Sequence, residues 1–356
     1  MVGRRSALLQ RALSQVAPGS ALREGLDRIV KAKTGALLVV GDGPEVLSIC
    51  TGGFLLDATF TPQRLSELAK MDGAIILARD ASRIARANVH LVPDVAVPTS
   101  ETGTRHRTAE RVARSLDVPV ISVSEEMGVI TIYARGDKHV LEDIPRLLNR
   151  ANQALQTLER YKSRLDDVTN TLATLEAEDL VTIRDVTAVL QRTEMVRRIA
   201  DEIAGYVVEL GVDARLIELQ LDELMADVDD DRQAMLQDYL GEDSGRTPAE
   251  ALLELSSLTT DDLLDPRTVG RVLGLPEGSE LDRSLTPRGY RQLAGVPRLP
   301  AEVVSSIVDR FPSLHRIMRA TVHELAEVPG VGEAHAVAVK EGLARLTESN
   351  ILDRFS

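Results

Sequence analysis

The hydrophobic pattern of the first 145 residues switches repeatedly between short apolar runs and helical periodicity. Apolar runs bounded by Gly or Asp predict strands near 35–41, 73–78, 84–92, 118–123 and 129–133. Apolar residues spaced three and four apart predict helices near 4–16, 20–32, 61–70 and 104–116. Strands that alternate with helices in this way indicate an N-terminal α/β domain with a mixed sheet, over residues 1–145.

From Leu147 the pattern becomes a heptad repeat, which predicts one helix roughly 43 Å long. Its apolar positions are 147, 151, 154, 158, 161, 165, 168, 172 and 175. Such a seam is typical either of a dimerising coiled coil or of a spine helix packed on its own neighbours. The spine is favoured, because further helices are predicted close by at 184–210 and 213–240, with breaks at Gly211 and Gly241. Residues 146–285 are therefore expected to form a helical spacer.

After Pro287 the chain contains an internal repeat with an offset of 32 residues. Leu293–Pro300 aligns with Leu325–Gly332, and each copy leads into an apolar helix. Two helix–turn–helix copies predict one all-α module over residues 286–356.

Composition describes an ordinary globular chain with an aliphatic core. Hydrophobic residues make up 44% and charged residues 27%, while aromatics are only 3% and Trp is absent. Cys50 is the single cysteine, which excludes an intramolecular disulfide and a zinc site built from cysteines. No apolar run reaches the roughly 18 residues of a membrane span, and the N-terminus lacks the pattern of a signal peptide. These features predict a cytoplasmic protein without a membrane partner.

The net charge of −13 is concentrated in the middle of the chain. Residues 1–145 carry 18 Lys and Arg against 17 Asp and Glu, and residues 286–356 carry 9 against 8. Residues 146–285 carry 15 against 30. Both ends are therefore free to bind anionic ligands despite the acidic total.

A basic segment opens the helix predicted at 104–116. Arg105, His106 and Arg107 fall in its first turn, where the helix dipole disfavours cations unless an anion is bound. Neighbouring Gly103 and the hydroxyls of Thr102, Thr104 and Thr108 add the donors that suit a polyphosphate. The alternative is a solvated basic turn.

Two further polar elements stand at strand ends. Asp72-Gly73 precedes the strand at 73–78; its carboxylate could bind a divalent metal, and its glycine lets a ligand approach the backbone. Ser124-Glu125-Glu126 follows the strand at 118–123. Both elements could instead be plain polar turns. The sequence leaves open whether they converge on one crevice.

Together these motifs resemble a known family. Asp72-Gly73-Ala74 and Arg105-His106-Arg107 are similar, in order and spacing, to the paired signatures of the diadenylate cyclase family, and Val123–Glu126 fits as well. The helical middle and the C-terminal repeat extend the likeness over essentially the whole chain, to members that carry a C-terminal helix-hairpin-helix domain.

The resemblance implies condensation of two ATP molecules into cyclic di-AMP with release of two pyrophosphates. Two cyclase domains must then face each other, so a homo-oligomer is expected, and family members form octamers. Asp72, Arg105, His106 and Arg107 would be catalytic, and Asp72 with Glu125 would bind Mg²⁺ or Mn²⁺. The implied contacts to ATP are Gly73, Leu91, Thr104, Arg105, His106, Arg107, Thr108 and Ser124.

The C-terminal repeat carries its own candidate site. Val328–Ala336 fits the helix-hairpin-helix pattern, in which Gly330 and Gly332 let backbone N–H groups face a DNA phosphate. The alternative is a turn used only for packing. Candidate phosphate contacts are Arg298, Arg319 and Lys340.

For the whole protein, the family likeness implies binding of branched DNA, such as a Holliday junction, that regulates the cyclase. The competing hypothesis is an ATP-sensing DNA-binding scaffold without cyclase activity. The presence of the full catalytic signature favours the enzyme.

Overall fold

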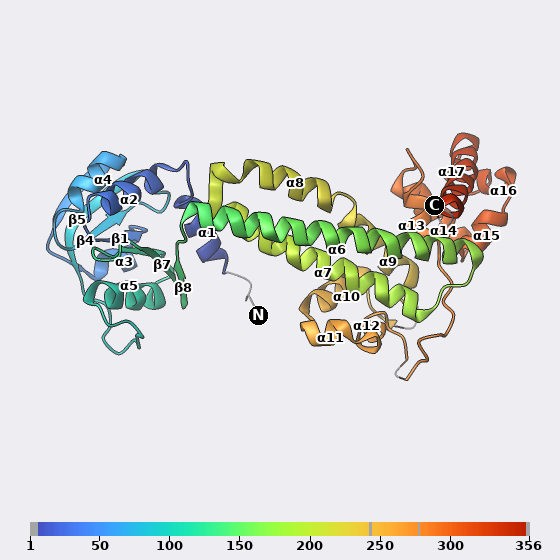
Figure 1. Cartoon of the computed structure of the whole chain (residues 1–356), viewed down its shortest axis with the longest axis horizontal. Helices are drawn as coiled ribbons and strands as arrows, with labels where there is room; N and C mark the ends of the chain where they lie inside the picture. The colour runs from blue at the N-terminus through green and yellow to red at the C-terminus, as the bar shows by residue number, and fades with distance from the viewer. Residues whose placement is uncertain (1–5, 242–243, 277, 354–356) are drawn as a thin grey trace. The chain divides into compact units, whose positions relative to one another are not determined.

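The computed structural model describes residues 6–241, 244–276 and 278–353, with side chains through residue 346. Contacts group the chain into two compact units (Figure 1). One unit holds the residues up to Gln153 together with Glu202–Gln220, and the other holds Ala154–Asp201 and the residues from Leu221 onward. The first two residues of the helix predicted at 4–16 lie outside the described residues, as do the outermost residues of the predicted terminal domains.

The first unit is built on a mixed sheet, as predicted. Its eight described strands run in the order β2-β5-β4-β1-β6-β7-β8, with β3 paired to β5. Among the described pairs only β1 and β4 are parallel. The strands are β1 Ala36–Val40, β2 Cys50–Thr51, β3 Phe54–Thr59, β4 Ala74–Leu77, β5 Arg83–Leu91, β6 Val120–Val123, β7 Ile130–Ala134 and β8 Asp137–Val140.

All five predicted strands are present, but the prediction missed β2, β3 and β8. β8 has no apolar run, and β3 has only the three-residue run Phe54-Leu55-Leu56, whose side chains are exposed. The short helix α3, Pro44–Ser48, was missed because it is only five residues long.

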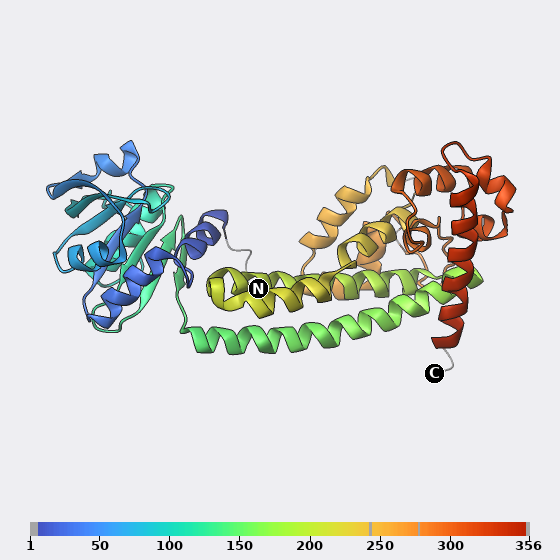
Figure 2. The ribbon, with the colours of Figure 1, turned by 90° about the horizontal axis from the view of Figure 1, so that it is seen from above.

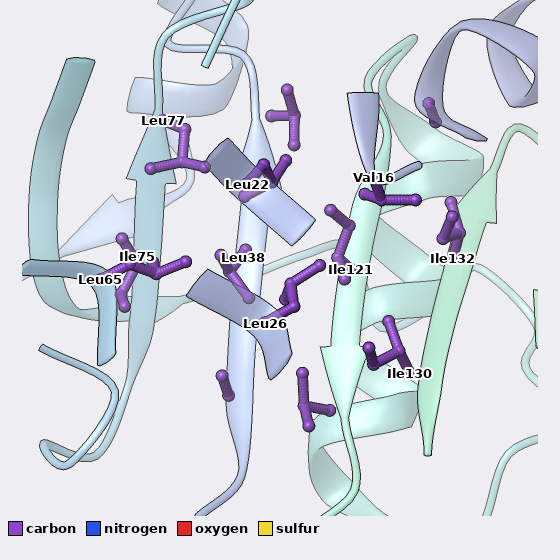
Figure 3. Close-up of a cluster of buried hydrophobic side chains, with 14 of the residues drawn as sticks. Val16, Leu22, Leu26, Leu38, Leu65, Ile75, Leu77, Ile121, Ile130 and Ile132 are labelled. Carbon is purple, nitrogen blue, oxygen red and sulfur yellow. The ribbon is translucent and has the colours of Figure 1, made fainter. Parts of the chain in front are cut away.

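Side chains that alternate along the strands divide the core into two layers. On one face, Leu38, Ile75 and Ile121 pack beneath α1 (Ala7–Gln15), α2 (Ala21–Lys31) and α4 (Pro62–Leu68), as Figure 3 shows in part. On the other face, Leu37 and Ile76 pack beneath α3 and α5 (Thr104–Ser115). The helix α5 is therefore held against the sheet by its buried side, which leaves its first turn at the rim.

The predicted spine helix is α6, Ile144–Glu178, followed by α7, Ile183–Leu210. The residues of these two helices that belong to the second unit run antiparallel, as Figures 1 and 2 show. Within α6 every position of the heptad seam is buried or half-buried inside the chain itself. The structure thus supports the spine interpretation over the coiled coil.

The helix predicted at 213–240 was wrong as a single element. A 3-10 turn, η1 (Gly211–Ala214), follows α7, and the rest divides into α8 (Arg215–Met225) and α9 (Val228–Tyr239). The break falls at Asp227, whose φ of 67° lies in the left-handed region and cannot continue an α-helix. Asp227 instead occupies the N-cap position of α9.

The remaining helices confirm the internal repeat. α10 (Pro248–Ser257), α11 (Thr260–Leu264) and α12 (Pro266–Val272) precede a C-terminal module with its own apolar core. In that module α13 (Tyr290–Ala294) and α14 (Ala301–Arg310) form the first copy, and α16 (Val322–Ala326) and α17 (Glu333–Asp353) form the second. α15 (Leu314–Arg319) joins the two copies. None of the helices in the described part of the chain is both long and apolar enough to cross a bilayer.

Candidate active site

The ends of four strands meet at one edge of the sheet. The register pairs Leu37 of β1 with Ala74 of β4, and Ala36 with Val123 of β6. Ala74 also pairs with Val89 of β5. The residues that lie at or just beyond these strand ends are therefore at the same edge: Asp72, Gly73, Leu91, Ser124 and Glu125. The strand-end motifs that the sequence left separate are thus brought to one edge.

Asp72 and Gly73 occupy a tight position beside β5. Gly73 has a φ of 94°, and a Cβ built on it would lie 2.9 Å from both the Asn88 carbonyl carbon and the Val89 oxygen. The glycine is therefore required by the approach of the β5 backbone, where the register shifts between β4 and β5. Asp72 is exposed, and no hydrogen bond or ion pair joins its carboxylate to another described residue.

The first turn of α5 reaches the same edge. Gly103 is its N-cap and supplies no side-chain hydrogen bond, and no acidic residue lies in the first turn. A Cβ on Gly35, which precedes β1, would lie 1.8 Å from Nη1 of Arg105, so the guanidinium rests directly on that glycine. The N-terminus of α5 therefore lies at the strand ends, where its uncapped N–H groups and Arg105 suit the binding of an anion.

Two other residues of this turn, Arg107 and Thr108, have local partners for their side chains. Arg107 donates from Nη2 to the Thr102 carbonyl at 3.0 Å, and Thr108 donates to the Thr104 carbonyl at 3.0 Å. Thr104 itself is exposed. In this conformation the Thr108 hydroxyl already donates its proton and cannot also donate it to a phosphate. The hydroxyl of Thr104 is accessible at the surface.

His106 begins a chain of hydrogen bonds that leads into the domain. Its Nδ1 lies 2.9 Å from the Tyr133 hydroxyl, which donates to Oε1 of Glu101 at 3.0 Å. Lys138 pairs with the same Glu101 oxygen at 2.5 Å. The sequence analysis missed Glu101, Tyr133 and Lys138. The available signal was the Tyr133 hydroxyl on a strand of mostly apolar residues.

Burial sets the charge states within this chain. It lowers the pKa of His106, against the opposing charge of Glu101. It also raises the pKa of Tyr133 well above its ordinary value, helped by the hydrogen bond to Glu101. Burial alone would raise the pKa of Glu101, but hydrogen bonds from Lys138 and Tyr133 outweigh it, so this pKa is lowered. At neutral pH Glu101 is thus a carboxylate and Tyr133 a neutral phenol.

Ser124 and Glu125 lie in the turn between β6 and β7. The Ser124 hydroxyl accepts a hydrogen bond from the Met127 N–H at 3.3 Å, while Glu125 is exposed. Among the described residues no three His, Cys, Asp or Glu side chains come close enough to hold a metal ion. Asp72 and Glu125 offer the hard carboxylate oxygens that Mg²⁺ prefers, and Mg²⁺ commonly completes its shell with substrate phosphates.

The second candidate site is the turn of the C-terminal repeat. Gly330 has a φ of 84°, and a Cβ added to Gly330 or to Gly332 would meet no described atom within 4 Å, so both backbones face open space. Arg298 and Arg319 are exposed. Lys340 differs from the expectation, because its Nζ donates to the Met318 carbonyl at 2.5 Å and closes the end of α15.

Comparison with known proteins covers both units of the chain. The nucleotide-binding region of the DisA bacterial checkpoint controller matches residues 23–138, and the linker region of the same controller matches residues 141–282. The DNA integrity scanning protein DisA of Frankia casuarinae is 57% identical over 346 residues, which is 96% of each chain.

Two other relatives of the same name agree. The protein of Kineococcus radiotolerans is 55% identical over 350 residues, covering 98% of each chain. That of Streptomyces griseus is 54% identical and covers 98% of this chain and 94% of its own. Because the likeness spans nearly the full length of both partners, the chain belongs to the DisA family of diadenylate cyclases.

Proposed function

We propose that the edge of the sheet that carries Asp72 is where this cyclase joins two ATP molecules into cyclic di-AMP. One observation supports the proposal most: a carboxylate with no partner among the described residues lies at the same sheet edge as the uncapped, basic N-terminus of α5. A carboxylate and an anion-binding helix terminus are the two halves that nucleotidyl transfer needs. The carboxylate would bind the metal and activate the attacking 3′-hydroxyl, and the helix terminus would stabilise the charge on phosphate.

The residues divide between these two tasks. Arg105, Arg107 and the N–H groups of the first turn of α5 hold the phosphates and stabilise the charge that develops on them. Asp72, with Glu125, holds Mg²⁺ or Mn²⁺, which supplies Lewis-acid activation of the 3′-hydroxyl when bound. Asp72 accepts the proton of that hydroxyl. Further contacts to the nucleotide come from Gly73, Leu91, Thr104, Thr108 and Ser124.

The product requires two copies of the site. Each domain has one Asp72 and one α5 terminus, so each ATP presents its 3′-hydroxyl to the α-phosphate held by the facing copy. A homo-oligomer is therefore part of the proposal, and an octamer agrees with the family resemblance. The substrate ATP and the lone half-buried Cys50 support action in the reducing cytoplasm.

The C-terminal module is proposed to bind branched DNA of the Holliday-junction type and to regulate synthesis. The open glycines 330 and 332 present backbone N–H groups, and exposed Arg298 and Arg319 add positive charge to a nearly neutral module. Lys340 contributes only if its bond to Met318 breaks. The functional regions are then the cyclase domain 1–145, the spine 146–285 and the DNA-binding module 286–356.

The variant Asp72→Asn tests the catalytic assignment. Incubation of the purified oligomer with ATP and Mg²⁺ or Mn²⁺, followed by mass spectrometry, is expected to yield cyclic di-AMP from the wild type. The variant should lose at least about 100-fold in rate, because an amide can neither bind the metal well nor accept the proton. DNA affinity should stay unchanged. Product from the variant would overturn the role of Asp72, and none from an oligomeric wild type would favour the ATP-sensing scaffold.

Charge reversal tests the DNA surface. Arg298→Glu with Arg319→Glu should weaken binding of a four-way junction by about 10-fold or more and flatten its salt dependence, since two phosphate contacts are lost. Synthesis without DNA should be unaffected. A matched control is Arg64→Glu, an exposed arginine on α4 in the other unit. Junction binding that survives the double reversal would exclude these two arginines as DNA contacts.

A further inference from the structure

The chain of hydrogen bonds behind His106 has only one consistent placement of protons. Glu101 is a carboxylate held by Lys138, so it can only accept. The Tyr133 hydroxyl has a single proton, and it donates that proton to Glu101 at 3.0 Å. The 2.9 Å contact between Tyr133 and Nδ1 of His106 therefore needs its proton from the ring. The neutral His106 ring carries its proton on Nδ1, and its Nε2 keeps a free lone pair.

We propose that Glu101 and Tyr133 are positioning residues of the cyclase, which hold His106 in the Nδ1–H form and present its Nε2 to the nucleotide phosphates. The inference rests on the proposed function, because it assigns the role of His106 in that same site. No described hydrogen bond engages Nε2, whereas Nδ1 is fixed from the domain interior. An outer partner that fixes the ring and tautomer of a functional histidine is a recurrent device in protein sites.

The three residues come from separate elements, so the ring orientation depends on the fold. His106 is on α5, Tyr133 on β7, and Glu101 in the loop before α5. The rings of His106 and Tyr133 meet edge to face, with centroids 6.2 Å apart. Tyr133 is 1% exposed and packs in the core layer beneath α5, which makes it a rigid anchor.

Charges on all sides of the ring set its response to bound phosphate. Glu101 favours the protonated ring, whereas burial, Lys138 on β8 and Arg105 on α5 oppose it. A phosphate oxygen at Nε2 requires a second ring proton, so nucleotide binding should be coupled to proton uptake by His106. Nucleotide affinity should therefore rise as the pH falls and His106 takes up its proton. Glu101→Gln keeps an acceptor for Tyr133 but removes the charge, so this rise in affinity should move to lower pH.

A double-mutant cycle separates positioning from general stability. The probe is 3′-deoxy-ATP with Mg²⁺, which lacks the attacking hydroxyl and cannot react, and its Kd is measured by calorimetry on the full-length protein. Tyr133→Phe should raise the Kd about 10-fold in the wild-type background, the lower end of effects typical of such outer partners. In the His106→Gln background the same change should alter the Kd less than about 2-fold, since the side chain it acts through is gone.

Tyr206→Phe is the matched control. Tyr206 is also buried in the same unit and donates to a carboxylate, Oε1 of Glu202, at 2.6 Å, but none of its described hydrogen bonds involves His106. Its loss should leave the Kd of 3′-deoxy-ATP unchanged. Equal losses from Tyr133→Phe in both backgrounds, or no loss in the wild type, would overturn the proposal.

A spectroscopic readout keeps the test independent of binding and of folding yield. In protein labelled with ¹⁵N-histidine, the His106 signals are those missing from His106→Gln. They should show protonated Nδ1 and bare Nε2 at pH 8 in the wild type and in Glu101→Gln. A wild type in which Nε2 is protonated and Nδ1 is not would overturn the assignment of the Nδ1–H tautomer to His106. Failure of the wild type to make cyclic di-AMP would instead count against the proposed function, because neither readout depends on turnover.

Discussion

At the scale of single residues, backbone geometry by itself requires the glycine that follows Asp72. Gly73 was expected to leave room for a nucleotide, yet the space of its missing side chain is filled by Asn88 and Val89 of the bulged strand β5. Asn88 itself has a φ of 54°. Asp72 thus precedes a glycine at positive φ that packs on the backbone of a bulge in β5, and bulges are over-represented next to active sites.

Gly73→Ala should accordingly destabilise the first unit by about 2 kcal/mol, since a positive φ and a backbone clash act together. The loss is measured as a lower midpoint of thermal unfolding and as faster hydrogen exchange of the amides in β4 and β5. Gly136→Ala is the control, because Gly136 has neither a positive φ nor a described atom within 4 Å of the added carbon. Equal stability of the two variants would show that the β5 backbone shifts without cost to make room for the added carbon.

At the scale of elements, the two copies of the C-terminal repeat share one turn geometry despite different residues. Gly330 in the second copy has a φ of 84°, and Arg298 at the equivalent place in the first copy has a φ of 63°. For a residue with a Cβ that conformation costs roughly 1 kcal/mol. The exposed side chain of Arg298 at this costly position agrees with the proposed contact to DNA.

Reciprocal substitutions test this geometry. Arg298→Gly should raise the free energy of unfolding of the module by up to about 1 kcal/mol while weakening junction binding, and Gly330→Ala should lower that free energy by a similar amount. Denaturant titration with a junction-binding assay on the same samples measures both. A destabilised Arg298→Gly would mean that contacts of the arginine outweigh its backbone strain.

At the scale of the whole molecule, buried ionic contacts tie the C-terminal module to the spine within the second unit. Glu176 of α6 accepts hydrogen bonds from Arg291, Gln292 and Tyr239. Asp238 of α9 accepts from three backbone N–H groups at the start of α13, those of residues 289 to 291, at 2.7 to 2.9 Å. Deleting residues 286–356 would remove these partners from both carboxylates and uncover the part of the spine against which the module packs, so point variants are the cleaner test of DNA binding.

Glu176→Gln should weaken the contact between the C-terminal module and α6. Removing one charge leaves Arg291 buried and uncompensated, at a cost of about 3 kcal/mol. Hydrogen exchange in peptides from 286 to 346 should accelerate, whereas exchange in the β-sheet should not change. Glu159→Gln, an exposed position on the same helix, serves as the control. Unaltered exchange in the module would show that packing alone holds it in place.

Local pattern was sufficient for much of this protein. The buried strands, the long α6 helix and the 32-residue repeat follow from side-chain periodicity, which depends only on neighbours in sequence. The motifs around Asp72 and Arg105 identify themselves because special chemistry needs particular residues at short spacing. The prediction missed β3, whose apolar run is only three residues long, and the break at Asp227, because a change of φ at one residue leaves no mark on side-chain periodicity.

What only the tertiary structure decided is which distant groups touch. The single edge that joins Asp72, Ser124 and α5 depends on strand register. The proton order from Glu101 to His106 depends on three elements meeting. The bond of Lys340 to the Met318 carbonyl likewise joins two helices that are separate in sequence. Such contacts are set by packing between segments far apart in the chain, for which local periodicity carries no information.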